Sequence, residues 1–258
     1  MGLYRDEGIV LRTHKLGEAD RIVSILTRQH GKVRAVAKGV RKTKSRFGAR
    51  LEPPTHLQLL FYEGRGDLDI VTQAETIDHF RAIRDDLDRL TRAVSMLEAA
   101  DQLGLEGEAN PALYQMLLGA LRALAGHSGP LVVPGFFLKV LALEGFRPVV
   151  EQCVECGATE PLVAFDLESG GTRCALHRVG PALSAEALRL VQDILGGRLG
   201  SALNERASAA TSEVDHLATR AMEHHLERRL RSIALLDHGG AAGPIGRQRP
   251  SSPQVKLV

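Results

Sequence analysis

The chain has 258 residues, of which 44% are hydrophobic and 25% are charged, and its formal net charge is only +2. This length and composition suit one to three domains with buried cores and argue against a minimal module. No apolar run reaches the roughly 18 to 20 residues that a membrane span needs, and no apolar segment follows the first charges as in a signal peptide. We therefore expect a cytoplasmic protein.

The first third of the chain alternates between apolar and polar residues in short runs, which is typical of strands. Gly31, between two such runs, can adopt the positive φ of a tight hairpin turn. Because closure removes exposed sheet edges, about five short strands in this space predict a small closed barrel. The predicted strands are 8–11, 21–27, 32–37, 56–61 and 68–71.

Ten of the 33 lysines and arginines fall in the window 21–51, which contains no Asp or Glu. Such a local excess of positive charge is typical of a phosphate-binding surface, so we expect nucleic acid to bind here. Phosphate contacts would make the binding largely independent of sequence and sensitive to salt. The candidate contacts are Arg28, Lys32, Arg34, Lys38, Arg41, Lys42, Lys44, Arg46 and Arg50.

Two other interpretations of this window stay open. It could be a solvated surface loop, or a membrane-surface patch, although no amphipathic helix or lipidation signal accompanies it. Aromatic side chains that could stack on bases are sparse: Phe47 lies in the loop, and only Phe61 and Tyr62 follow. Since Phe61 is expected in the core, base stacking has little support at this level and phosphate contact carries the hypothesis.

From about residue 80 the apolar period becomes helical, beginning with Ile83, Leu87, Leu90, Val94 and Leu97. Further helices are predicted after Asn110-Pro111, across 136–143 up to Gly145, from Ser184 to Leu195 with Ser184 as N-cap, and from Ser212 to Leu236. The last 22 residues, 237–258, are rich in Gly, Pro and Ser, which predicts disorder. Strands first and helices afterwards predict an α+β, multidomain chain.

The three cysteines form one constellation: Cys153-x2-Cys156, then 17 residues, then Cys174-x2-His177. Two pairs at this spacing match the template of a four-ligand zinc site. Four protein ligands close the tetrahedron and leave no position for a catalytic water, so we expect one structural Zn²⁺ per chain. The alternative is three buried cysteines beside an incidental histidine.

The sequence offers little support for an enzyme. It lacks the phosphate-binding G-x4-G-K-[ST] motif, the G-x-S-x-G nucleophile motif and the H-E-x-x-H zinc motif. Three aspartates could suggest a metal-dependent nuclease, and three histidines on the last predicted helix a second metal site, but both groups suit exposed helix faces. These residues are Asp85, Asp86, Asp88, His216, His224 and His225.

Several segments in order resemble the recombination-mediator family RecO. They include Glu7 to Leu11, Gly17 to Val23, Gly31 to Val33, Ala37 to Arg41, Leu51 to Pro53 and Ala74-Glu75. The resemblance covers roughly 1–236 and is most specific over 7–54. It implies an oligonucleotide/oligosaccharide-binding (OB) barrel followed by a helical domain that carries the zinc-binding insertion.

The resemblance also implies what the protein does. Members bind single- and double-stranded DNA and anneal complementary strands. With the partner RecR they help load RecA onto DNA covered by single-strand binding protein, whose acidic C-terminal tail they recognise. None of this needs nucleotide hydrolysis, so the expectation is a nucleoid-associated, non-enzymatic protein. By match, the phosphate-contact candidates are Lys38, Arg41, Lys42, Lys44 and Arg46.

The expected domains are an OB-fold DNA-binding domain over 1–80, a helical domain over 81–150 and 178–236, a zinc knuckle over 151–177 and a disordered tail over 237–258. Two features depart from the family pattern: His177 stands where cysteine is the alternative ligand, and the tail has no pattern we can assign. A zinc-containing RNA-binding or translation-associated protein is the alternative, since its barrel and basic loop would look the same.

Overall fold

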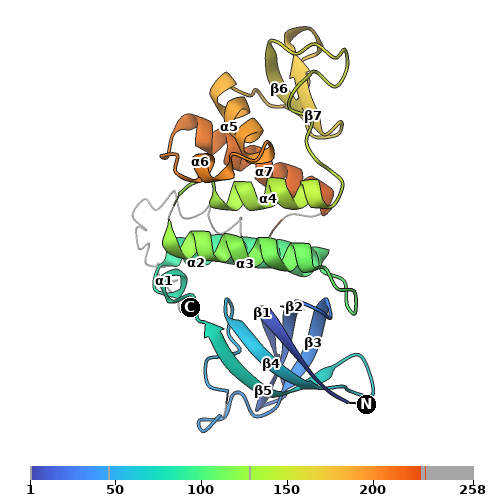
Figure 1. Cartoon of the computed structure of the whole chain (residues 1–258), viewed down its shortest axis with the longest axis vertical. Helices are drawn as coiled ribbons and strands as arrows, with labels where there is room; N and C mark the ends of the chain where they lie inside the picture. The colour runs from blue at the N-terminus through green and yellow to red at the C-terminus, as the bar shows by residue number, and fades with distance from the viewer. Residues whose placement is uncertain (1, 46, 128, 228–229, 231–258) are drawn as a thin grey trace, which may run out of the picture.

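A computed structural model describes residues 2–45, 47–127, 129–227 and 230 of the chain. The described part is elongated, with a barrel at one end, two layers of helices next to it and a two-stranded hairpin at the far end (Figure 1). The predicted tail, 237–258, lies outside the described residues. Among the helices that are described, none is both long and apolar enough to cross a membrane.

The N-terminal strands close into a barrel, which confirms the predicted architecture. The order around the barrel is β1-β2-β3-β5-β4, with β3 and β5 parallel and the other neighbours antiparallel. This is the five-stranded OB-type barrel that the resemblance implies. The strands are β1 (Leu3–Leu16), β2 (Asp20–Thr27), β3 (Lys32–Ala37), β4 (His56–Tyr62) and β5 (Asp69–Asp78).

Strand β1 is much longer than the predicted 8–11. Its first half pairs with β4, from Leu3 opposite Tyr62 onward, and its second half pairs with β2 up to Leu16 opposite Asp20. A bulge near Val10 lets one strand serve both neighbours. Its polar ends carry no apolar alternation, so periodicity alone detected only the buried middle.

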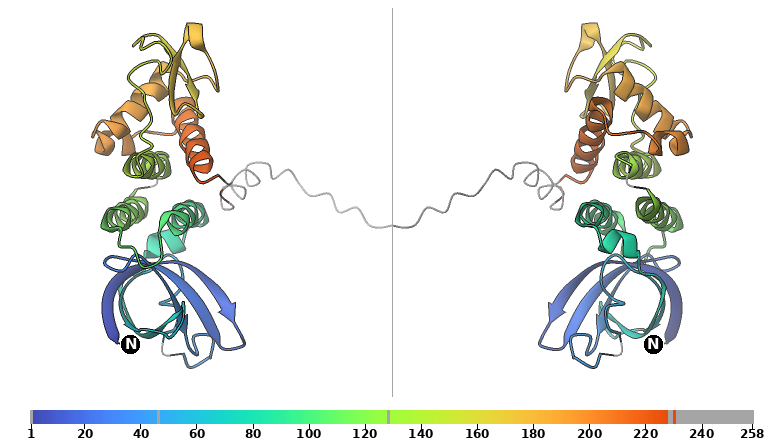
Figure 2. Two further views of the ribbon diagram at one scale, coloured as in Figure 1. Left: turned by 90° about the vertical axis from the view of Figure 1, so that its right-hand side faces the viewer. Right: turned by 90° about the vertical axis from the view of Figure 1, so that its left-hand side faces the viewer.

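The C-terminal part is helical, as predicted, with the cysteine hairpin inserted into it. The side views show α2 (Leu87–Leu103) and α3 (Pro111–Gly126) stacked on the barrel, with the short α1 (Arg81–Arg84) next to the barrel and the later helices beyond (Figure 2). The helices are α1 (Arg81–Arg84), α2 (Leu87–Leu103), α3 (Pro111–Gly126), α4 (Val132–Leu143), α5 (Ala185–Leu195), α6 (Leu199–Leu203) and α7 (Ala209–His225). The insertion contains β6 (Leu162–Asp166), β7 (Gly171–Cys174) and the 3₁₀ turn η1 (Ala175–His177).

Two expected helices differ from the prediction. The run expected from Ile83 to Leu97 is broken, because the Asp86 side chain accepts a hydrogen bond from the Arg89 N–H and starts α2 as its N-cap. Leu87 is 79% exposed, so it is not a core position. The helix expected from Ser212 to Leu236 ends at His225, and Glu227 just after it adopts positive φ; residues 231–236 lie outside the described part of the chain.

Other helix signals are confirmed. Asn110 caps α3 with Pro111 in its first turn, and Ser184 caps α5. Gly145 takes a positive φ just after α4. Helix α7 begins at Ser208, whose side chain and that of Thr211 form a reciprocal capping box.

The barrel and helices share one interface. Three buried side chains of the barrel strands pack in the apolar core of the helices and not in that of the barrel: Ile9, Leu11 and Leu26. Beside them, the Nε2 atom of buried His56 lies 2.7 Å from the Tyr114 hydroxyl of α3. Apolar burial and a buried hydrogen bond therefore hold the barrel against α2 and α3.

Candidate nucleic-acid interface and metal centre

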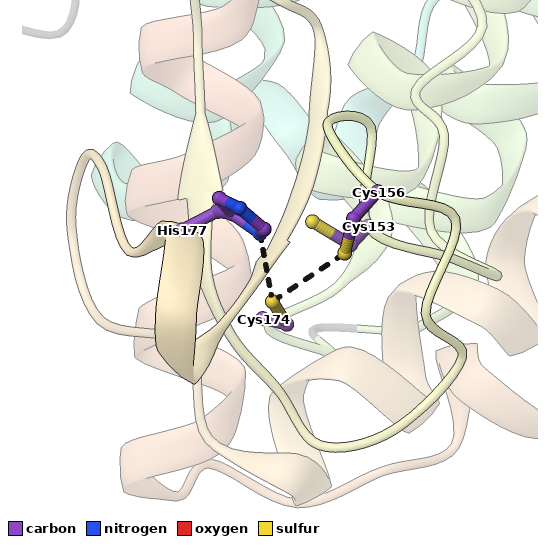
Figure 3. Close-up of side chains that lie close together, drawn as sticks. All are labelled: Cys153, Cys156, Cys174 and His177. Carbon is purple, nitrogen blue, oxygen red and sulfur yellow. Dashed lines mark hydrogen bonds between the residues drawn. The ribbon is translucent and has the colours of Figure 1, made fainter.

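The four predicted metal ligands come together at the tip of the insertion (Figure 3). Cys153 and Cys156 lie on one turn, Cys174 ends β7, and His177 ends the 3₁₀ turn that follows. Their ligand atoms all lie within 4.8 Å of one another. Among the described residues, no other group of three or more His, Cys, Asp or Glu side chains converges in this way.

The distances fit a tetrahedral metal. Cys156 Sγ lies 3.8 Å from Cys174 Sγ, and Cys174 Sγ lies 3.3 Å from His177 Nδ1. Two sulfurs bound to one zinc at about 2.3 Å, at the tetrahedral angle, stand about 3.8 Å apart. The side chains are therefore already at ligand spacing, and three thiols with one imidazole are a donor set that zinc favours.

The local backbone explains why these residues converge. The Gly157 N–H donates to the Cys153 carbonyl at 2.8 Å, and the Cys153 N–H donates to the Ala158 carbonyl at 2.7 Å. Gly157 takes φ +75°, a conformation that a residue with a Cβ adopts only under strain. The turn thus points the first two thiols to one side.

Hydrogen bonds from the backbone favour the thiolate form of Cys153. Burial raises the pKa of the Cys153 thiol, but hydrogen bonds from the backbone of Cys174, Cys156 and Glu155 outweigh this and lower the pKa to about 6. A thiolate is the form that binds a metal. Cys153 is therefore not simply an inert core thiol.

An ion-pair network that the sequence did not reveal supports the site. The Arg173 guanidinium, one residue before Cys174, lies 2.8 Å from the Asp166 carboxylate and also pairs with Glu155, between the first two cysteines. The hydrogen bond from Arg173 lowers the pKa of the Asp166 carboxyl. Arg173 therefore ties β6 and the first knuckle to the strand that carries the third ligand.

The basic stretch is a loop, residues 38–55, fixed at its start to the barrel. The Gly39 N–H donates to the Asp20 carboxylate at 2.7 Å, and the Arg41 N–H donates to the Ala19 carbonyl at 2.9 Å. The Arg41 guanidinium also donates to the Gly17 carbonyl. These bonds place the start of the loop on the tip of the β1–β2 hairpin.

The middle and end of the loop are fixed too. Phe47 and Leu51 are buried in the barrel core, so Phe47 is not the base-stacking platform that its position in the loop allowed. Arg84 of α1 donates to the Glu52 and Pro54 carbonyls. Sequence reasoning missed Arg84, because it looks like any charged helical residue.

With its apolar residues turned inward, the loop presents its cations outward. Lys38, Arg41, Lys42, Lys44 and Arg50 are all exposed. Arg46, predicted in the same group, lies outside the described residues. The loop is therefore a positively charged surface with a fixed backbone.

The other three candidate contacts are placed differently. Arg28 is half exposed and lies 3.7 Å from the Glu7 carboxylate, and Arg34 lies 3.7 Å from that of Glu106. Lys32 is largely buried, and its ammonium donates to the Asp101 carbonyl of α2 at 2.6 Å. Lys32 thus joins the barrel to the helices and has little surface left for a phosphate.

The aspartates considered as a nuclease site have structural roles. Asp86 caps α2, Asp85 pairs with Arg81, and Asp88 pairs with Arg92. The histidines His216, His224 and His225 lie along α7, and the ring of His225 contacts Phe146 at a centroid distance of 4.3 Å.

Comparison with known proteins gives two family matches in series. Residues 1–80 match the model described as "Recombination protein O N terminal", and residues 84–234 match "Recombination protein O C terminal". A protein named DNA repair protein RecO from Frankia casuarinae is 46% identical over 244 residues, covering 92% of this chain and 99% of the relative. One of the same name from Thermobifida fusca is 43% identical, with the same coverage.

Proposed function

Because the chain belongs to the RecO family of DNA repair and recombination proteins, we propose that it is a non-enzymatic mediator that anneals DNA strands. It binds single- and double-stranded DNA through the barrel, in the cytoplasm where the nucleoid lies. The observation that carries the proposal is the exposed basic loop, whose backbone is fixed to the barrel while its cations face solvent.

The mechanism follows from charge. Two complementary strands repel each other through their phosphates, and this repulsion opposes their encounter. The cations of the loop lower that repulsion by binding the phosphates of both strands, and they raise the local strand concentration. Because the contacts are to phosphates, annealing needs no particular sequence and no nucleotide hydrolysis.

The four ligands of the insertion hold a structural Zn²⁺ in this proposal. The donor set and the 3.8 Å sulfur spacing support zinc, and the four protein ligands leave no open position for catalysis. When bound, the ion ties β7 and the 3₁₀ turn to the Cys153–Cys156 turn. Its contribution is to folding.

We also propose that the protein acts with RecR to help load RecA onto DNA covered by single-strand binding protein. The acidic, apolar C-terminal tail of that partner needs an apolar groove beside a cation. A cavity of about 210 Å³ between α3, α4 and α6 has this character. Met116, Phe136, Leu199 and Leu203 line it, and Lys139 supplies the charge.

A peptide copying that acidic tail tests the groove. We expect Lys139→Glu to weaken peptide binding at least about tenfold, because it replaces an attractive charge by a repulsive one. Glu144→Gln, just beyond the same helix, is the control and should leave the affinity unchanged. Equal affinity of Lys139→Glu and wild type would rule out this groove.

The annealing activity itself is tested with two labelled complementary strands, both coated with cognate single-strand binding protein, and no nucleotide. We expect the wild type to accelerate annealing and a Lys38/Arg41/Lys42/Lys44→Glu variant to lose the effect. The acceleration should fade as salt is raised.

Other outcomes separate the alternatives. No acceleration by the wild type would contradict the mediator function. Tighter binding to RNA than to DNA at matched salt would favour the RNA-binding alternative, and metal-dependent loss of the strands would indicate a nuclease.

A further inference from the structure

One row of outward-facing apolar side chains crosses three strands of the barrel. Val36 of β3 pairs with Ile70 of β5, and Ile70 pairs with Tyr62 of β4. Phe61 and Val71, their neighbours along the strands, are fully buried in the barrel. Because side chains alternate between the two faces of a strand, the row of three faces outward. Side chains directly opposite on paired strands lie about 5 Å apart, so the row is continuous.

Tyr62 makes this row unusual. Its side chain is 40% exposed, whereas Phe47, Phe61 and Phe80 are buried and Tyr4 is half-buried. Within the described residues of 2–80, Tyr62 is thus the only exposed Phe, Tyr or Trp. Val36 and Ile70 are half-buried and extend its apolar surface toward β3.

Cations border the row on its β3 side. Arg34 lies two residues before Val36 and shares its face, and Lys38 directly follows the strand and begins the basic loop. On the opposite side, the loop after Tyr62 carries Arg65 but also the acidic Glu63 and Asp67. A phosphate chain would therefore run along the β3 side, with its bases directed toward the ring.

We propose that Val36, Ile70 and Tyr62 form a platform for unpaired nucleobases, with the phosphates held by Arg34, Lys38 and the basic loop. The platform rests on the proposed function, since it assumes that the barrel binds nucleic acid. An exposed aromatic ring stacks on a base whatever its identity, so the contact favours single strands without reading their sequence. In a duplex the base faces are covered, so the platform releases its strand once pairing is complete.

The test compares three fluorescent probes of equal length: a single strand, an abasic strand with the same phosphates, and a duplex. Stacking of one base on an aromatic side chain corresponds to about 5- to 150-fold in affinity. We expect Tyr62→Leu to weaken binding of the intact strand by a factor in this range and to leave the other two probes unchanged. Tyr62→Phe should keep wild-type affinity for all three.

Ile77→Ala provides the matched control, because Ile77 is an exposed apolar residue of the same β5 that lies outside the row. It should bind every probe as the wild type does. Wild-type affinity of Tyr62→Leu for the intact strand would overturn the platform, as would an equal loss on all three probes. No affinity of the wild type for any probe would contradict the proposed function itself.

Discussion

The barrel and the cysteine insertion are held together by different forces. The barrel encloses a cluster of 12 buried apolar residues, including Phe47 and Leu51 from its basic loop. Within the insertion, a separate cluster has three buried members, Cys153, Leu162 and Cys174, two of which belong to the candidate metal site, while Phe165 packs into the core of the helices. A small unit that buries little apolar surface of its own relies on a cross-link, and a metal ion held by the four candidate ligands would provide one here.

The largest expected effect is that of metal removal, which should unfold the insertion and leave the barrel folded. Apparent zinc-binding free energies in small zinc peptides are about 10 to 16 kcal/mol at pH 7, and that energy is folding energy. We expect chelation, or Cys174→Ser, to abolish hydrogen-exchange protection in 149–181 while β1–β5 stay protected. If 149–181 were as protected from hydrogen exchange in a preparation shown to hold no metal as in the untreated protein, the insertion would fold without the metal.

The reverse experiment deletes apolar surface from the barrel. Phe61 is fully buried, and Phe61→Ala should cost about 3 to 5 kcal/mol of barrel stability in urea unfolding. The metal stoichiometry of the folded variant should stay at the wild-type value, because the ligands lie in another core. If the folded Phe61→Ala variant held less metal than the wild type, the two regions would not be independent.

The sequence predicts the barrel and the insertion through two different signals. Alternation predicted the barrel because its core is apolar, and ligand spacing predicted the insertion because four side chains must meet at one point. Neither signal could reveal that Phe47 turns inward or that Lys32 bonds to Asp101, since both depend on contacts between distant segments. The break at Asp86 was missed because the prediction followed the helical period of the apolar residues, whereas the Asp86 side chain caps and starts a new helix.

A smaller effect is expected where the barrel meets the helices. Tyr114→Phe removes the hydroxyl that lies 2.7 Å from His56 and leaves a buried ring nitrogen without that partner. An unsatisfied buried polar group costs about 1 to 3 kcal/mol, measured as a lower unfolding midpoint.

The smallest effect is a pH dependence at this interface. Burial lowers the pKa of His56 below its usual 6.5, against the opposing effect of Glu7. The folded state therefore favours neutral His56, so the unfolded state binds more protons and stability falls as pH drops below 6.5. Comparing unfolding midpoints between pH 7 and pH 5, His56→Gln should show a shallower loss than the wild type. Identical slopes would exclude His56 as the source.

The central claim is that the exposed cations of the basic loop bind phosphates, and the salt dependence of single-strand binding tests it most directly. Each phosphate contact contributes about 0.7 to the slope of log K against log salt. We expect Lys38/Arg41/Lys42/Lys44→Gln to reduce that slope by up to about 3. A control that replaces Arg81, Arg147, Arg206 and Arg220, all exposed in the C-terminal part, by Gln should keep the wild-type slope. An unchanged slope in the loop variant, or an equal reduction in both, would contradict the claim.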